Sequence, residues 1–225
     1  MKRIIWLAAL PLTACVAAPA EPDTGEAHEA MTLGITTRVD FDVDPNGAAI
    51  ADGTAVDNTY AAVGVHFSSI YCGATASCGP ASAYARAGGN ASNNGVSLFS
   101  YGWPWFDARW GAVEATFDNP GDSVSIDAYA LDFVESLSSG PSTSPFLEAY
   151  DASGNFLGKV FAPINMGVWQ TMTISTGTNN IKRVRFSVPG FPPAAGDHVY
   201  AIFDNLMHHQ NVELPTIRRC KFFPC

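Results

Sequence analysis

The stretch Gly111-Ala-Val-Glu-Ala-Thr-Phe117, followed by Asp118-Asn-Pro-Gly121 and Ser123-Val-Ser-Ile-Asp-Ala-Tyr129, decides the fold of this chain. Within it, apolar residues alternate with mostly polar ones from Val113 to Phe117 and again from Val124 to Ala128. Such a period of two predicts a strand that buries one face, and a Pro-Gly turn between two such runs is typical of an antiparallel hairpin. We therefore expect a hairpin of two paired strands here.

Similar runs, separated by turn residues, recur on both sides of this hairpin, and no stretch has the pattern of a long helix. About eight or nine short strands of this kind predict an all-β, antiparallel sandwich or barrel in a single domain. The other predicted strands are residues 38–43, 61–67, 146–150, 156–161, 169–175, 181–188 and 200–207.

The composition fits one sizeable β domain and excludes one class of partner. The chain has 225 residues, of which 47% are hydrophobic and only 15% charged, with 20 glycines and 15 prolines to supply turns. The formal net charge of −9 argues against nucleic acid, because neutralising phosphates requires clustered Lys and Arg. An acidic chain is compatible with a cell-envelope protein or with cations bound by carboxylates.

The N-terminus has the pattern of an export signal. Lys2 and Arg3 precede the apolar run Ile4–Leu12, which is too short to span a bilayer stably. The next residues complete Leu12-Thr-Ala-Cys15, which resembles the bacterial lipobox. The resemblance implies cleavage before Cys15 and acylation of its thiol. Each acyl methylene buried in the membrane would contribute about 0.8 kcal/mol to anchoring.

The residues after the cysteine bear on where the protein goes. Val16 follows Cys15, and the aspartate that would resemble an inner-membrane retention signal is absent at this position. We therefore expect a lipid-anchored protein of the outer membrane or cell surface. The alternative is an ordinary secretory signal cut after Ala18-Pro19-Ala20, which would release a soluble secreted protein.

These features divide the chain into four parts. A signal peptide occupies residues 1–14, and the lipidated cysteine with a flexible tether occupies residues 15–37. The tether is rich in Pro, Ala and acidic residues and shows no alternation. The β-sandwich covers residues 38–208, and a C-terminal tail with a cysteine pair covers residues 209–225. The basic and aromatic residues 218–223 of this tail could touch a partner or an anionic surface, or simply be solvated.

Five segments carry a resemblance to a family of domains: Val39-Asp-Phe-Asp42, Ile50-Ala-Asp-Gly-Thr54, the segment 60–67, the segment 148–158 and Ile202-Phe-Asp-Asn-Leu206. Together they resemble jelly-roll domains of secreted bacterial surface proteins that end in a PEP-type sorting signal. These domains are similar to galactose-binding-like carbohydrate-binding modules. The resemblance implies a jelly-roll β-sandwich and a carbohydrate-binding role. The sorting signal is absent from this sequence, and the lipobox would replace it as the anchor.

Carboxylates spaced two apart raise the possibility of a structural calcium ion. Asp40, Asp42 and Asp44 precede Gly47, as oxygen ligands precede the glycine of a calcium loop, but the bidentate glutamate of such a loop is missing. In the resembled modules, a structural calcium lies where the first and last strands meet, and Asp204 occupies the matching position of the last strand. We expect calcium to be bound by Asp204 with Asp40 or Asp42. The alternative is that these carboxylates are solvated and form turns.

An aromatic run just before the opening stretch is the candidate carbohydrate-binding site. The apolar faces of sugars stack on indole and phenol rings beside hydrogen-bonding side chains. Gly102 and Pro104 break the strand period here, which favours a loop. The alternative is that the rings pack into the core. The candidate residues are Tyr101, Trp103, Trp105, Asp107, Arg109 and Trp110.

With Cys15 acylated, four cysteines remain, and an even number of cysteines in an exported chain indicates disulfides. Three connectivities are possible, and we favour pairing of neighbours in sequence, Cys72 with Cys78 and Cys220 with Cys225. A zinc site that also uses His208-His209 is disfavoured, because the cysteine spacings do not match the usual short chelating turn.

The sequence contains no motif of a known catalytic site. A Gly-x-Ser-x-Gly elbow, a His-Glu-x-x-His pair and a phosphate-binding loop are all absent. We therefore expect a non-enzyme that binds carbohydrate or mediates adhesion, with the membrane and a polysaccharide or envelope protein as partners. A purely structural or protein-binding role is the alternative. A jelly-roll glycoside hydrolase or lyase using Glu114 or Glu135 is the remaining possibility.

Overall fold

A computed structural model describes residues 32–72, 78–87, 96–99, 111–131, 144–162, 168–187 and 200–214, and these residues are almost entirely β-strand. They form twelve strands and one short 3₁₀ helix, η1 (Ala61–Val63). The strands are β1 (Thr32–Val39), β2 (Val65–Cys72), β3 (Cys78–Ala81), β4 (Tyr84–Ala87), β5 (Val96–Phe99), β6 (Gly111–Gly121), β7 (Ser123–Leu131), β8 (Phe146–Tyr150), β9 (Phe156–Phe161), β10 (Trp169–Ser175), β11 (Ile181–Ser187) and β12 (Tyr200–Glu213).

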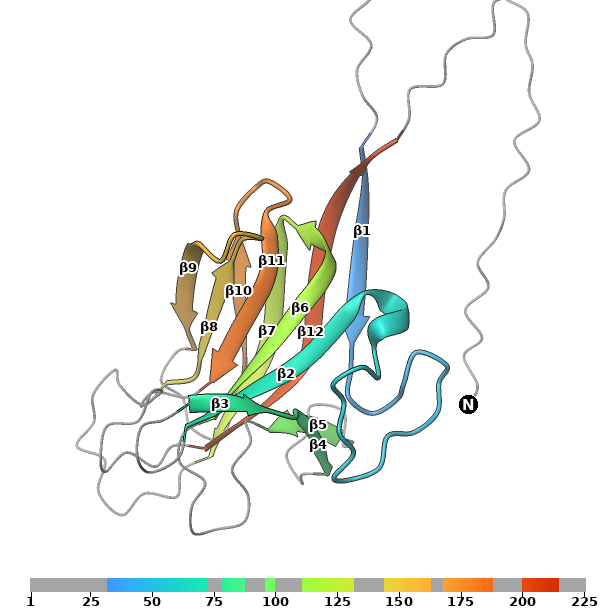
Figure 1. Cartoon of the computed structure of the whole chain (residues 1–225), viewed down its shortest axis with the longest axis vertical. Coiled ribbons are helices and arrows are strands. Elements are labelled where there is room, and N and C mark those ends of the chain that lie inside the picture. The colour runs from blue at the N-terminus through green and yellow to red at the C-terminus, as the bar shows by residue number, and fades with distance from the viewer. Residues whose placement is uncertain are drawn as a thin grey trace, which may run out of the picture.

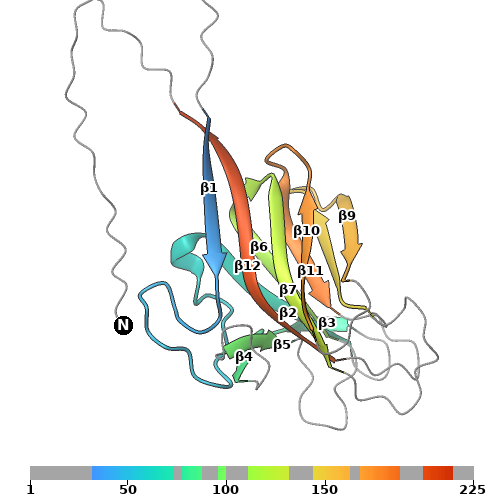
Figure 2. The same cartoon turned by 180° about the vertical axis from the view of Figure 1, so that it is seen from behind.

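The strands form two antiparallel sheets that face each other (Figure 1; from behind, Figure 2). The first sheet has the order β10-β7-β12-β5-β4, with β1 also paired to β12, and the second has the order β3-β2-β6-β11-β8-β9. The chain changes sheet at every step between successive strands except from β2 to β3, from β4 to β5 and from β8 to β9. The predicted antiparallel jelly-roll β-sandwich is confirmed. The strand number exceeds eight or nine because β3, β4 and β5 are too short to show an alternation.

The opening stretch forms two strands, as predicted, but the predicted hairpin is wrong. β6 pairs with β2 and β11 of the second sheet, whereas β7 pairs with β10 and β12 of the first. The predicted turn at 118–121 is the last part of β6, and the chain crosses between the sheets at Asp122. Alternation identifies the buried face of each strand but not the strand's partners. Two successive strands can pair side by side in one sheet, or they can lie in opposite sheets with their buried faces toward each other, as β6 and β7 do.

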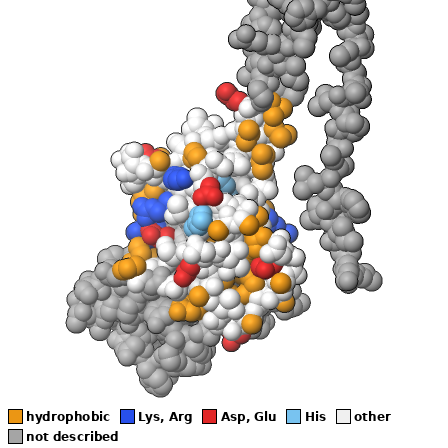
Figure 3. Space-filling model, turned by 45° about the vertical axis from the view of Figure 1, so that its right-hand side comes forward, with side chains coloured by type: hydrophobic (Ala, Val, Ile, Leu, Met, Phe, Trp, Pro, Cys, Tyr) orange, Lys and Arg blue, Asp and Glu red, His pale blue; other side chains and the backbone are white. Residues whose placement is uncertain are grey.

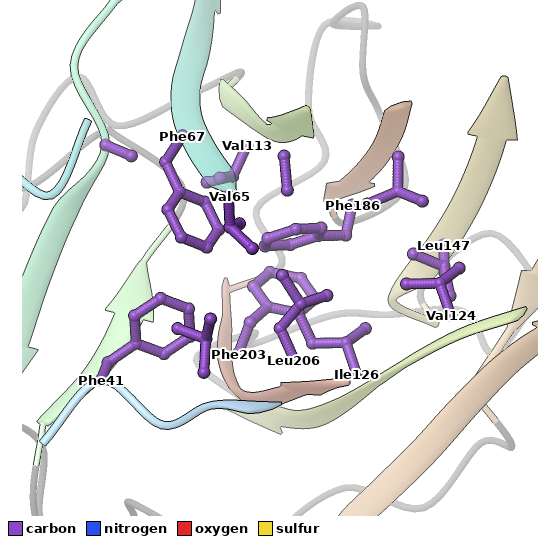
Figure 4. Close-up of a cluster of buried hydrophobic side chains, with 14 of the residues drawn as sticks. Phe41, Val65, Phe67, Val113, Val124, Ile126, Leu147, Phe186, Phe203 and Leu206 are labelled. Atoms are coloured by element: carbon purple, nitrogen blue, oxygen red, sulfur yellow. The ribbon is translucent and has the colours of Figure 1, made fainter. Parts of the chain in front are cut away.

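The core lies between the sheets and is built from the predicted alternating positions (Figure 4). Phe186 of the second sheet contacts Phe203 of the first, with ring centroids 4.9 Å apart. Phe41 and Phe67 make an edge contact at 5.4 Å, and both rings also pack against Tyr60. Burying each such ring stabilises the fold by roughly 1.5–3 kcal/mol.

β12 organises the first sheet because three strands pair with it. β7 lies along one edge, while β5 and β1 share the other edge, β5 at the start of β12 and β1 at its end. The last pairs, from Ile35 opposite Gln210 to Thr32 opposite Glu213, lie beyond the reach of β7, whose pairing ends at His209. Paired strands thus extend past both predicted sandwich boundaries, at residues 38 and 208. The pairing joins distant segments and was not visible in the sequence pattern.

The two ends of the sandwich differ. At one end, which we call the far end, Gly111 lies opposite Tyr71 in the second sheet and Leu131 opposite Tyr200 in the first. At the other end, β1 and β12 continue alone as a two-stranded ribbon, made of Thr32–Ile35 and Gln210–Glu213 (Figure 1). Among the described residues, no helix is long and apolar enough to cross a membrane.

Candidate functional site

The residues predicted to bind carbohydrate lie outside the described residues. This applies to Tyr101, Trp103, Trp105, Asp107, Arg109 and Trp110, and also to Cys15, Cys220 and Cys225. The strand that follows the aromatic run is β6, which begins at the far end of the sandwich. The proposed site therefore joins the described fold at that end.

The described residues contain a second candidate surface, the outer face of the second sheet. Antiparallel register aligns four charged side chains in one row across β6, β11, β8 and β9: Glu114 is opposite Arg185, Arg185 opposite Glu148, and Glu148 opposite Lys159. The charges along this row alternate in sign. Figure 3 shows basic and acidic side chains side by side on the left of the described surface. We call this row, with the neighbouring Arg183 and Tyr150, the charged row.

The charged row is held by hydrogen-bonded ion pairs. The Nη2 and Nε of Arg185 donate to Glu114 Oε1 at 2.8 Å and 3.0 Å, and Arg183 Nη1 donates to the same oxygen. Lys159 Nζ lies 3.0 Å from Glu148 Oε1, and the Tyr150 hydroxyl donates to Glu148 Oε2 at 2.6 Å. The side chains of Glu114 and Glu148 are only 13% and 15% exposed, so these contacts are partly shielded from water.

Aromatic rings border the charged row. The Arg183 guanidinium lies 4.3 Å from the Tyr150 ring centroid, and Lys159 Nζ lies 3.7 Å from that of Phe146. Burial, and then the hydrogen bond to Glu148 and its charge, raises the pKa of Tyr150 to about 12. The rings of Phe156 and Phe161 on β9 are 58% and 49% exposed. These two rings are therefore available for contact with a ligand.

This surface combines the groups that a sugar ligand needs, and both of its carboxylates are held in ion pairs. Exposed rings can stack on sugar faces, and guanidinium and carboxylate groups can exchange hydrogen bonds with hydroxyls. Glu114 accepts hydrogen bonds from two arginines, and Glu148 from Tyr150 while pairing with Lys159. Glu135 lies outside the described residues.

Sequence reasoning missed the charged row. Arg183 and Arg185 are spaced two apart within Ile181–Ser187, and Glu114 and Glu148 each lie between apolar neighbours in a predicted strand. This pattern predicts that each of the four side chains lies on the outer face of its strand. Only the order of the strands, which the sequence pattern does not contain, shows that these faces adjoin.

The predicted calcium ligands lie near one buried tyrosine. The hydroxyl of Tyr60 lies 3.0 Å from the carbonyl oxygens of both Asp40 and Val43 and donates its proton there. Burial, followed by the charges of Asp40 and then Asp204, raises the pKa of Tyr60. Asp40 Oδ1 is buried without a hydrogen-bond partner, and Asp204 is 1% exposed. The carboxylates of Asp40, Asp204 and Asp42 therefore all lie close enough to the Tyr60 hydroxyl for their charges to raise its pKa.

The described part of the chain contains no group of three or more His, Cys, Asp or Glu side chains arranged to hold a metal ion. A calcium ion at Asp40 and Asp204 would therefore need backbone oxygens or water to complete its six to eight ligands. The calcium site remains a prediction.

One predicted disulfide has a compatible backbone register. β2 and β3 pair antiparallel, and Cys72 lies directly opposite Cys78. Directly opposed residues in an antiparallel pair have Cα atoms about 4.5–5.5 Å apart, within the range that a disulfide spans. The bond itself remains a prediction.

Comparison with known proteins places the chain in no family. No protein-family model and no curated protein matches it. Among solved structures, a mutant of CBM29-2, a family 29 carbohydrate-binding module, has a TM-score of 0.37 at 10% identity, covering 78% of this chain and 93% of that one. A β-1,2-glucanase from Parabacteroides distasonis has a TM-score of 0.31 at 15% identity, covering 68% of this chain and 23% of that one. At these TM-scores the likeness carries no inference about function.

Proposed function

We propose that this protein is a non-catalytic carbohydrate-binding β-sandwich of the cell envelope. The observation that carries the proposal is the outer face of the second sheet, where the partly buried charged row lies beside the exposed rings of Phe156 and Phe161. In this proposal the rings stack on sugar faces, and Arg183, Arg185 and Lys159 donate hydrogen bonds to hydroxyls. The segment 101–110 supplies further rings.

Retention on polysaccharides tests the proposal. The purified chain is run in affinity gels that contain soluble polysaccharides and is incubated with insoluble ones. We expect binding to at least one of them and no release of sugar products. Each stacked ring contributes roughly 0.5–1.5 kcal/mol, so Phe156→Ala with Phe161→Ala weakens binding about tenfold.

Two further variants separate the candidate surfaces. Trp103→Ala with Trp105→Ala tests the segment 101–110, while Val63→Ala removes an exposed apolar side chain of η1 outside both surfaces and leaves binding unchanged. Absence of retention on every polysaccharide would favour a protein-binding or structural role instead. Release of oligosaccharides would favour a hydrolase or lyase.

The proposed location rests on Leu12-Thr-Ala-Cys15. Acylation at Cys15 would attach the sandwich to the outer membrane or cell surface through the tether. Metabolic labelling with a radioactive fatty acid labels the wild type, and Cys15→Ser abolishes the label and moves the protein out of the membrane fraction. An unlabelled wild type in the medium would support the secreted alternative.

A structural calcium ion is the cofactor we propose, held by Asp40 and Asp204. The buried, unpartnered Oδ1 of Asp40 supports it, because a bound cation would satisfy this oxygen. Calcium that binds only the folded state raises the melting temperature. We expect a chelator to lower it, and Asp40→Asn to remove the difference. Identical melting with calcium and with chelator would rule the site out.

A further inference from the structure

The ribbon at the end of β1 and β12 has one mainly apolar face, interrupted by Gln210 opposite Ile35, that continues the core stripe. Residues directly opposite in an antiparallel pair share a face, so Leu33 and Val212 lie on the same face as the buried pair Val39 and Leu206. Closer to the sandwich this face is buried, but at the ribbon Leu33 is 50% and Ile35 is 37% exposed. The core stripe thus runs out of the sandwich into an exposed position.

The opposite face of the ribbon is polar. It carries Thr32, Asn211 and Glu213, and His209 Nδ1 lies 2.6 Å from Asp122 Oδ1 at its base. Asn211 also pairs with Asp122, through its Nδ2 at 2.6 Å. The ribbon is therefore amphipathic, with an apolar stripe that ends at Leu214, itself 37% exposed. Figure 3 shows hydrophobic side chains on this narrow upper part of the molecule.

Both ends of the chain join the fold at this ribbon. Because Thr32 lies opposite Glu213, the sequence before residue 32 and the sequence after Leu214 attach side by side. The sequence after Leu214 contains Arg218, Arg219 and Lys221, followed by two phenylalanines, in a chain of net charge −9. Cations near an anionic membrane surface are attracted to it, and aromatic rings favour the interface. The cationic segment and the exposed apolar stripe beside it together call for a partner that is both anionic and apolar, and an anionic phospholipid bilayer has both properties.

We propose that the ribbon is a membrane-contacting surface, with its outer end and the apolar stripe of Leu33, Ile35, Val212 and Leu214 entering the headgroup layer of an anionic phospholipid bilayer end-on. The inference builds on the proposed attachment at Cys15, because that anchor would join the fold at the same end. It adds a fixed orientation: the far end, where the segment 101–110 joins the sandwich, points away from the membrane. A ligand would then be met by the end opposite the anchor.

Hydrogen–deuterium exchange on the full chain tests this orientation. The protein is bound to vesicles of phosphatidylcholine alone or of phosphatidylcholine with phosphatidylglycerol. We expect peptides that cover 32–36 and 210–214 to exchange several-fold more slowly on the anionic vesicles, while peptides of β9 are unchanged. Combining Arg218→Ser, Arg219→Ser and Lys221→Ser removes this protection, and high salt weakens it.

A matched pair of variants isolates the apolar stripe. Leu33→Ser changes a ribbon residue that is 50% exposed, and Val168→Ser changes one at the far end that is 53% exposed. We expect only Leu33→Ser to reduce protection. Unchanged exchange of the ribbon on bound protein, or equal slowing at the far end, would overturn the inference.

Separate measurements test the proposed acyl anchor and the proposed membrane contact of the ribbon. Sedimentation with pure phosphatidylcholine vesicles reports the acyl anchor, whereas the additional protection on anionic vesicles reports the ribbon. Ribbon protection that depends on protein concentration without any vesicles would show a second copy on the stripe and would also overturn the inference.

Discussion

His208 is a histidine placed where an apolar residue would be expected. It is 5% exposed and stacks on Phe117 with ring centroids 3.8 Å apart and planes inclined by 10°. Its Nε2 is buried without a hydrogen-bond partner. Burial, and secondarily the charge of His209, lowers the pKa of His208 to about 4 from its usual 6.5, while Asp122 acts in the opposite sense. The folded protein therefore holds His208 neutral.

This makes stability sensitive to mild acid. Between pH 6.5 and 4 the unfolded chain protonates His208 and the folded chain does not, so the free energy of unfolding falls as the pH falls. The expected loss is about 3 kcal/mol across this range, from 1.36 kcal/mol per pKa unit. Urea unfolding at several pH values measures it. His208→Phe keeps the stacked ring without the proton site, so it should lose less stability than the wild type; equal losses would contradict the assignment.

Gly121 ends β6 where β12 passes closely. A Cβ at this position would overlap the carbonyl oxygen of His209 and the imidazole of His208. Gly158 in β9 is the matched control, because the nearest atom to an added Cβ there is Ile174 Cγ2 at 4.0 Å. Overpacking of this kind costs roughly 1–3 kcal/mol. We expect Gly121→Ala to lose that much in urea unfolding and Gly158→Ala to lose almost nothing; similar values for both would refute the close contact.

At the scale of strands, the charged row is predicted to stabilise the second sheet through Glu114. Glu114→Gln leaves Arg183 and Arg185 without their shared carboxylate in a site that is only 13% exposed at Glu114, so we expect a loss of about 1–3 kcal/mol. Asp118, on the same strand as Glu114, pairs with His66 of β2 but is 57% exposed. Asp118→Asn should therefore cost less than about 1 kcal/mol. Thermal unfolding of both variants checks the contrast, which would vanish if the row contributed nothing.

Strands were easier to predict than their partners, for a physical reason. The alternation in β6 and β7 identified their buried residues, including Val113, Phe117 and Ile126, because burial depends on the local pattern. Pairing depends on which edges meet, and β6 and β7 meet across the core instead. The pairing of β8 with β9 does have a local signal, because the short turn Asp151–Asn155, with Gly154 at φ +82°, joins the two predicted strands directly.

At the scale of the whole molecule, the same reasoning explains why the sequence predicted neither the ends of the sandwich nor the charged row. β1 lacks a simple buried face, since only Val39 of its residues is buried, so its pairing with β12 had no local signal. The charged row likewise joins residues from strands far apart in sequence. The fold class and the core positions could be predicted from the sequence, because the alternation that indicates them recurs in strand after strand along the chain.

The position of β12 leads to a prediction about the integrity of the fold. β12 is the last of the described strands, yet β1, β5 and β7 all pair with it, and Phe203 and Leu206 lie in the core. A chain that ends before Tyr200 would leave β1 without a partner, separate the pair β7-β10 from the pair β4-β5, and leave one face of the core uncovered. We expect it to show no cooperative thermal transition by circular dichroism, because the sandwich cannot close without β12. A chain that ends after Leu214 keeps every described strand and should melt within a few degrees of the full chain. Cooperative melting of the shorter chain would mean that the sandwich closes without β12, and that the strand serves mainly to carry the ribbon.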